Sequence, residues 1–138
     1  MQILGLEQAV ELILEKDPRY RRDAYFFLRE SLDFTMKRRR KNRKVVATTH
    51  VSAVELVEGF RDRALQEFGP MAITVLYYWG IKSSSDIGEM VFHLIEIGIL
   101  GKTENDTRAS FAHLLDFHQT FVLPFEPAQP APPLLVAV

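Results

Sequence analysis

The chain has 138 residues, 47% of them hydrophobic, which predicts one domain with a core of its own. It contains no cysteine, which excludes disulfides and thiolate metal sites and fits a reducing compartment, so we expect a cytoplasmic protein. The net charge of −1 hides an asymmetry, because seven of the 17 Lys and Arg residues lie in the run 37–44, which leaves 10 basic against 18 acidic residues.

Apolar residues at helical spacing predict an amphipathic helix in the first 16 residues, with Glu7, Glu11 and Glu15 on another face. These glutamates argue against a signal peptide, and no apolar run is long enough to span a membrane. The Asp17–Pro18 step should end the helix. A second helix is expected from near Tyr20, and its predicted buried stripe is Ala24, Phe27, Leu28, Ser31, Leu32 and Thr35, widened by Phe26 and Phe34.

The basic run KRRRKNRK at 37–44 follows this second helix without a breaker, so it is expected to extend the helix by about two turns. Such a run attracts phosphates or an acidic protein surface. Helical spacing would place Arg38, Lys41 and Lys44 along one side and Arg39 and Arg43 along another, which suits contact with a nucleic-acid backbone better than base reading. The candidate nucleic-acid-binding residues are Lys37, Arg38, Arg39, Arg40, Lys41, Arg43 and Lys44.

Ser52 and Glu55 form a capping-box pattern, which predicts the start of a third helix. Gly69–Pro70 predicts its end. The stretch 71–79 is apolar almost all round, so a helix there should be the most buried element. The predicted core side of the third helix is Val54, Val57, Phe60, Ala64, Leu65 and Phe68.

The serines at 83–85 with Asp86 predict the cap of a further helix that closes at Gly98. The stretch after it has two interpretations. Residues 99–103 and 107–111 could pair as a short hairpin, or 107–117 could form a final helix. The predicted stripe of the capped helix is Ile87, Met90, Val91, Leu94 and Ile95.

The segment 71–111 resembles a winged helix-turn-helix: an apolar helix, the turn KSSS, the helix DIGEMVFHLIEIGIL and the hairpin candidate GKTENDTRASF. Recognition helices that enter the major groove carry basic or amide residues near their start. This helix has Asp86, Glu89 and Glu96 and no Lys or Arg, so we do not expect it to read DNA. RNA, or a ribosome-like particle contacted through the separate basic run, is favoured over DNA.

Three longer stretches resemble a family of uncharacterised proteins from planctomycetes and verrucomicrobia. They are EGFR through EFGPMA at 58–72, VFHL at 91–94, and GILGKTE at 98–104, with supporting positions in AYF at 24–26 and HVS at 50–52. The resemblance covers most of residues 20–125. The family has no assigned activity, so the resemblance implies no catalytic residue. The dense basic run is not part of its typical pattern.

Signatures of catalysis and metal binding are weak. The chain has no cysteine nucleophile, no nucleophile elbow and no phosphate-binding loop. Glu89, His93 and Glu96 share one helical face, but one helix supplies only part of a metal site. The aromatic row 77–79 is either a core element or a stacking platform for bases. A second loose cluster holds His113, Asp116 and His118, which do not converge on a helix or a strand.

The sequence thus predicts a mainly α protein, with a helical domain at 1–123 that contains the winged-helix-like unit and with or without a short hairpin. A proline-rich extended tail is expected at 124–138. We expect a non-enzymatic binding protein without cofactor, metal or evident small-molecule substrate, which contacts nucleic acid through the run 37–44. The alternative is a protein-interaction or assembly subunit, with contacts from the acidic helical faces and the apolar end 134–138 and with an acidic partner on the basic run.

Overall fold

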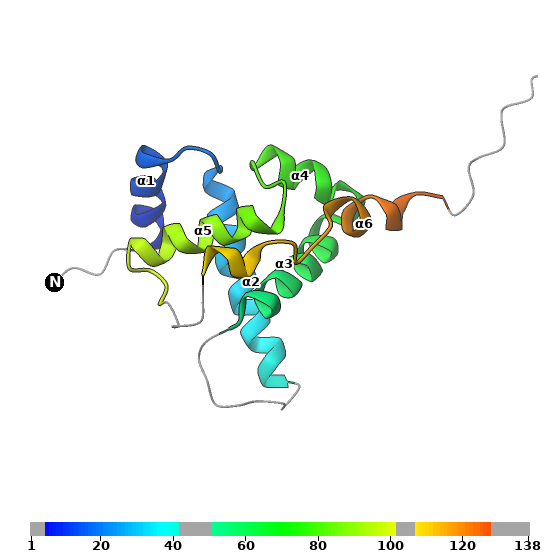
Figure 1. The fold of residues 1–138 in the computed structure, drawn as a ribbon, viewed down its shortest axis with the longest axis horizontal. Helices are drawn as coiled ribbons and strands as arrows, with labels where there is room; N and C mark the ends of the chain where they lie inside the picture. Colours follow the sequence, from blue (N-terminus) through cyan, green and yellow to red (C-terminus); the bar gives the residue numbers. More distant parts are fainter. Residues whose placement is uncertain (1–4, 42–50, 102–106, 128–138) are drawn as a thin grey trace, which may run out of the picture.

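The described part of the chain is a set of helices, and it contains no strand (Figure 1). The structure is a computed structural model that describes residues 5–41, 51–101 and 107–127. The mainly α prediction is confirmed. The elements are α1 (Leu6–Lys16), α2 (Arg22–Lys41), α3 (Ala53–Phe68), α4 (Ala72–Tyr78), α5 (Ser84–Glu96) and α6 (Phe117–Phe121), with short 3-10 turns η1 (Gly69–Met71), η2 (Arg108–Phe111) and η3 (Leu123–Phe125). None of the described helices is long and apolar enough to cross a membrane.

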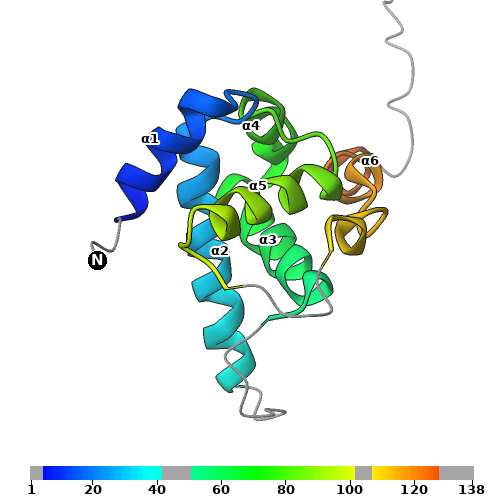
Figure 2. The ribbon, with the colours of Figure 1, turned by 60° about the vertical axis from the view of Figure 1, so that its left-hand side comes forward.

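The long helices α2 and α3 pack side by side, and α5 lies across both of them, with α1 against α2 and α5 (Figures 1 and 2). The α2–α3 contact is close because small polar groups stand where the helices meet. Ser31 and Thr35 donate hydrogen bonds to the carbonyls one turn earlier in α2, so their hydroxyls are satisfied inside the contact. Gly59 of α3 faces Thr35, and a Cβ at this glycine would overlap Thr35 Oγ1.

Aromatic rings fill the core where α2, α3 and α4 meet. Phe27 packs edge-on against Phe60 with ring centroids 5.0 Å apart, and it also contacts Phe68 and Trp79 at 5.5 and 5.3 Å. Edge-on and tilted arrangements are favoured by the ring quadrupoles, and they stabilise the fold beyond the burial of apolar surface alone. Ser52 caps α3 as predicted, with Glu55 N–H donating to its hydroxyl, but Val54 is 48% exposed and Leu56 takes its place in the core.

The most buried helix is α5, not the one predicted. Seven of its 13 residues are buried, including the predicted Ile87, Met90, Val91 and Leu94. Asp86 holds its start, because one carboxylate oxygen accepts from the backbone N–H groups of Lys82 and Ser83. The other oxygen accepts from the buried Tyr20 hydroxyl at 2.5 Å, which ties α5 to the α1–α2 turn.

The helix expected to be the most buried, α4, exposes much of its surface. Ala72, Leu76 and Trp79 face the core, whereas Met71, Tyr77 and Tyr78 are 57%, 54% and 63% exposed. A segment that is apolar all round predicts burial only when neighbours cover every side. At the edge of this helical set, α4 is covered on one side only, so the prediction is wrong.

Neither interpretation of the stretch after α5 is right within the described residues. The residues at 107–116 form the single turn η2 and an irregular link with a turn at 112–113, and α6 begins only at Phe117. Ser84 explains the link, because its buried hydroxyl donates to the Phe111 carbonyl and accepts from Leu114 N–H. Gly88 lets the Phe111 ring lie against α5, where a Cβ would come within 2.6 Å of it. The turn of the predicted hairpin, at 104–106, lies outside the described residues.

The expected boundary before Pro124 falls inside η3, of which Pro124 is the second residue. The chain therefore keeps helical turns up to Phe125. The tail from 128 lies outside the described residues.

Candidate functional site

The basic run continues α2 as predicted, and the structure places five of the seven candidate residues in its last turns. Lys37, Arg40 and Lys41 are exposed, and Arg38 and Arg39 are half-buried. Positive side chains at this end are favoured by the partial negative charge of the helix C-terminus. Arg43 and Lys44 lie outside the described residues.

Two of the five cations are held by carboxylates of α3. Arg38 Nη1 lies 2.5 Å from Asp62 Oδ2, and its guanidinium also covers the Phe34 ring at 5.2 Å. Arg39 Nε lies 3.6 Å from Glu55 Oε2. Arg38 and Arg39 therefore face α3.

Asp62 is the centre of this contact. Partial burial would raise its pKa, but hydrogen bonds from Arg61 at 2.8 Å and from Arg38 outweigh burial and lower the pKa below its usual value. The carboxylate stays charged at neutral pH. The fold therefore places an anion directly beside the basic end of α2.

Lys37, Arg40 and Lys41 form no ion pair with any residue of the described ranges, 5–41, 51–101 and 107–127. Their spacing of three and four residues puts them on one side of the helix. Unpaired cations fixed on a rigid helix suit contact with a row of phosphates. Of the five predicted site residues that the structure describes, these three are available for such a contact.

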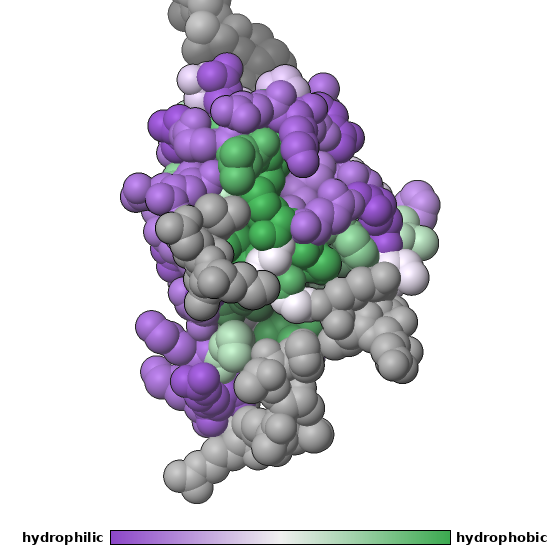
Figure 3. Space-filling model, turned by 90° about the vertical axis from the view of Figure 1, so that its left-hand side faces the viewer, coloured by the Kyte–Doolittle hydropathy of each residue, from purple (hydrophilic) through white to green (hydrophobic). Residues whose placement is uncertain are grey.

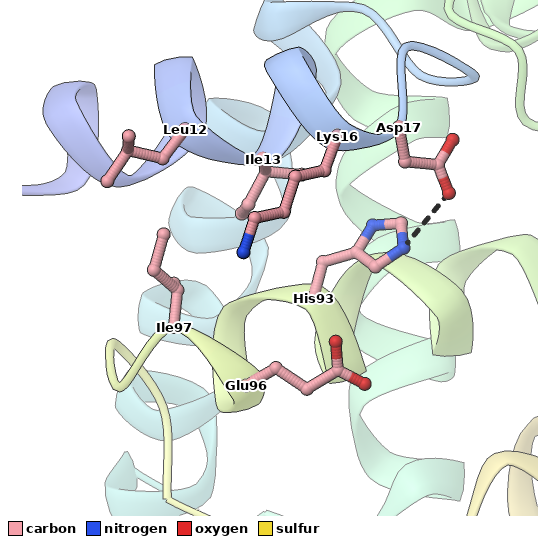
Figure 4. A pocket seen from close by; sticks show the side chains of 7 residues that line it. All are labelled: Leu12, Ile13, Lys16, Asp17, His93, Glu96 and Ile97. Atoms are coloured by element: carbon pink, nitrogen blue, oxygen red, sulfur yellow. Dashed lines mark ion pairs between the residues drawn. The ribbon is translucent and has the colours of Figure 1, made fainter.

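A second feature is a groove between α1 and the end of α5, with a cavity volume of about 260 Å³ (Figure 4). The face that carries α1 shows a strip of hydrophobic surface between hydrophilic side chains (Figure 3). Leu12, at 40% exposed, is one of the apolar residues of the groove. The groove is lined by Leu12, Ile13, Lys16, Asp17, His93, Glu96 and Ile97.

His93 stands at the polar end of the groove, where it joins three elements. Its Nδ1 lies 2.8 Å from the hydroxyl of the fully buried Tyr25, and its Nε2 lies 3.4 Å from Asp17 Oδ2. Asp17 in turn pairs with Arg19 at 2.7 Å. Burial lowers the pKa of His93 and so favours the neutral ring. Because the Asp17 carboxylate beside Nε2 can only accept, it favours the tautomer with the proton on Nε2, in which Nδ1 accepts from the Tyr25 hydroxyl. Both ring nitrogens therefore have protein partners.

The chain matches no protein-family model, no curated protein and no solved structure.

The predicted metal trio is engaged in other contacts. Glu89 and Glu96 both pair with Arg108, and Glu89 also lies 3.4 Å from Arg19. Within the described ranges no group of three or more His, Cys, Asp or Glu side chains is placed to hold a metal ion. In the other predicted cluster His113 and His118 are exposed, and Asp116 caps α6 by accepting from Gln119 N–H at 3.0 Å.

Sequence reasoning missed the Asp17–His93–Tyr25 chain and the Asp62 contact. The Asp17–Pro18 step indicates only the end of a helix, and Tyr25 and His93 are 68 residues apart in the sequence. No pattern in the sequence predicts that these three residues are in contact, because they meet only when α1, α2 and α5 pack together. The aromatic row was identified, and the structure divides it into the buried Trp79 and the exposed Tyr77 and Tyr78.

Proposed function

We propose that the chain is a non-enzymatic protein that binds nucleic-acid backbone through the basic end of α2. The observation that carries the proposal is the exposure of Lys37, Arg40 and Lys41 on one side of a helix end, without carboxylate partners in the described part of the chain. Arg38 and Arg39 stand beside them in ion pairs that exchange readily, because partly exposed pairs contribute little free energy. Arg43 and Lys44 belong to the proposal on sequence grounds alone.

The proposed mode is contact with phosphates rather than base reading. Each neutralised phosphate releases counterions, so the affinity should fall steeply with salt and depend little on sequence. The winged-helix-like unit is not proposed as the reader of DNA, because α5, its second helix, is the most buried helix and carries Glu89 and Glu96 on its accessible side. RNA or a ribosome-like particle is proposed ahead of DNA, and the cytoplasm as the location.

The test is binding of labelled RNA and DNA duplexes across a salt series, with the wild type and the variant Lys37→Gln/Arg40→Gln/Lys41→Gln. A variant with the same change of net charge elsewhere, Lys16→Gln/Arg22→Gln/Arg29→Gln, is the control. We expect the first variant to reduce the salt slope by about two to three units and the control to change it by less than one. Absence of binding by the wild type at low salt would refute the proposal.

The alternative is a protein-interaction subunit, and the apolar groove between α1 and α5 is the observation in its favour. Leu12 and Ile97 line a hollow that no described element fills. An acidic partner on the basic end would show the same salt dependence as nucleic acid. Nucleic acid that copurifies with the protein, seen as excess absorbance at 260 nm and lost in the triple variant, separates the two.

A further inference from the structure

Tyr77 and Tyr78 present their rings to solvent from the end of α4, although the residues on either side, Leu76 and Trp79, are buried. Leu76 and Trp79 therefore belong to the core. No helix of the described residues covers the two adjacent aromatic rings between them. Both are more than half exposed, at 54% and 63%.

Arg21 lies directly against one of these rings, that of Tyr78. Its guanidinium carbon is 4.2 Å from the centroid of the Tyr78 ring, and its Nε donates to the Tyr78 carbonyl at 3.2 Å. Its backbone N–H donates to the Trp79 carbonyl at 3.1 Å. Gly80 lets the two segments meet, because with φ of 91° it packs where a Cβ would overlap the Arg19 carbonyl. The cation is thus fixed beside the Tyr78 ring before any ligand arrives.

The charge of Arg21 is not neutralised within the described ranges, which sets it apart from its neighbours. Arg19 pairs with Asp17, and Arg22 pairs with Glu11. No carboxylate of the described residues pairs with Arg21, and the next cation after the rings, the exposed Lys82, is also unpaired there. The end of α4 thus carries two exposed rings on adjacent residues, and a fixed cation without a carboxylate partner lies on one of them.

We propose that Tyr77, Tyr78 and Arg21 form a stacking site for unpaired nucleobases, with Arg21 available to the adjoining phosphate. Aromatic faces and guanidinium planes accept any base, but only a base that is not already stacked in a duplex. The choice of nucleic acid as the partner rests on the proposed function, and the stacking site narrows that function to single-stranded segments.

The stacking site and the basic run lie near opposite ends of α2. Arg21 directly precedes α2, and Lys41 is its last residue, so 20 helical residues separate them by about 30 Å. Figure 1 shows α4 beside the start of α2, away from its basic end. A strand of about four nucleotides reaches one site only, whereas a longer strand reaches both.

The experiment measures the affinity of labelled oligouridine of about four and about 16 nucleotides, and of an RNA duplex, by fluorescence anisotropy. The variant Tyr77→Ala/Tyr78→Ala removes the rings, and Tyr77→Phe/Tyr78→Phe keeps them. We expect the Ala variant to lose about 5- to 100-fold in affinity for both single strands while the Phe variant and the duplex affinity stay unchanged.

The result separates the two proposals. Single-strand affinity that is unchanged in the Ala variant, with binding that still depends on Lys37, Arg40 and Lys41, overturns the stacking site and leaves the proposed function standing. Binding of the short strand without any duplex binding supports the stacking site and refutes the backbone clamp. An Ala variant that changes only the oligomeric state, measured by sedimentation, identifies a protein contact and overturns the stacking site.

Discussion

The Arg38 guanidinium of α2 lies 2.5 Å from the Asp62 carboxylate of α3, so one cation of the candidate interface is bound to an anion inside the fold. Arg61 shares the carboxylate at 2.8 Å. Both side chains of the Arg38 pair are partly exposed, and such pairs contribute about 0–1 kcal/mol. The pair therefore positions Arg38 next to the exposed cations. Little free energy is needed to break it, so Arg38 can exchange Asp62 for a phosphate.

Replacing the carboxylate should strengthen binding. In Asp62→Asn the negative charge beside the interface is gone and Arg38 is free, so we expect nucleic-acid affinity at low salt to rise by about 3- to 10-fold, with a steeper salt dependence. Asp23→Asn, the same change near the other end of α2, is the matched control. Equal gains in both variants would show that only net charge matters and would contradict a local role for Asp62.

The close α2–α3 contact predicts a specific penalty at Gly59. Alanine is the better helix former, by about 1 kcal/mol, but its Cβ would overlap Thr35 Oγ1, so we expect Gly59→Ala to lower the free energy of unfolding by about 1–3 kcal/mol. Urea unfolding measures this value. Glu58→Ala, at the exposed neighbour, should change stability by less than about 0.5 kcal/mol.

A second substitution checks that the loss comes from this overlap. Thr35→Ala removes the opposing hydroxyl, so Gly59→Ala should cost much less in that background. Equal costs in both backgrounds would mean that the glycine matters for another reason than its contact with Thr35.

His93 should make the stability depend on pH. Burial lowers its pKa in the folded state below 6.5, the value for an exposed ring, so the unfolded chain binds the proton more tightly. The contribution of neutral His93 to the free energy of unfolding is therefore fully present above pH 6.5. It is lost as the pH falls from 6.5 through the pKa that His93 has in the folded state. The charged groups near the ring are Asp17, Arg19, Glu89 and Glu96, of which Asp17 and the glutamates oppose the shift and Arg19 adds to it.

Chemical unfolding at a series of pH values measures this slope. We expect the loss between pH 7 and 5 to shrink in His93→Asn, which keeps a polar atom toward Tyr25 but does not titrate, and to persist in His118→Asn, where the ring is exposed. An unchanged slope in His93→Asn would assign the pH dependence to other groups.

The Tyr20 hydroxyl should contribute to the free energy of unfolding. Its short hydrogen bond goes to the charged Asp86 carboxylate, and burial, followed by Asp86, raises the Tyr20 pKa so that the hydroxyl keeps its proton. Tyr20→Phe leaves that oxygen of Asp86 unpaired, at an expected cost of about 1.5–3 kcal/mol of unfolding free energy. Tyr77→Phe, at an exposed ring, should be neutral, and similar losses in the two variants would contradict the assignment.

The sequence patterns predicted correctly those features that depend on interactions between neighbouring residues. The Ser52 cap, the end of α1 at Asp17 and the continuation of α2 into the basic run were all predicted, because each depends on residues within one helical turn. Burial of α4 was predicted wrongly, because burial depends on which elements surround a helix. The link after η2 was missed, because the Ser84 hydroxyl that holds it is 27 residues from its Phe111 partner.

The sequence by itself determined the helical class, the helix ends and the concentration of positive charge at 37–44, since periodicity, capping and composition are properties of neighbouring residues. Only the tertiary structure decided which of those basic side chains pair with carboxylates and which are exposed. The packing of α3 against α2 turns Arg38 and Arg39 toward carboxylates and leaves Lys37, Arg40 and Lys41 exposed. It also leaves Tyr77 and Tyr78 exposed beside Arg21, because a side chain is buried only where another element covers it.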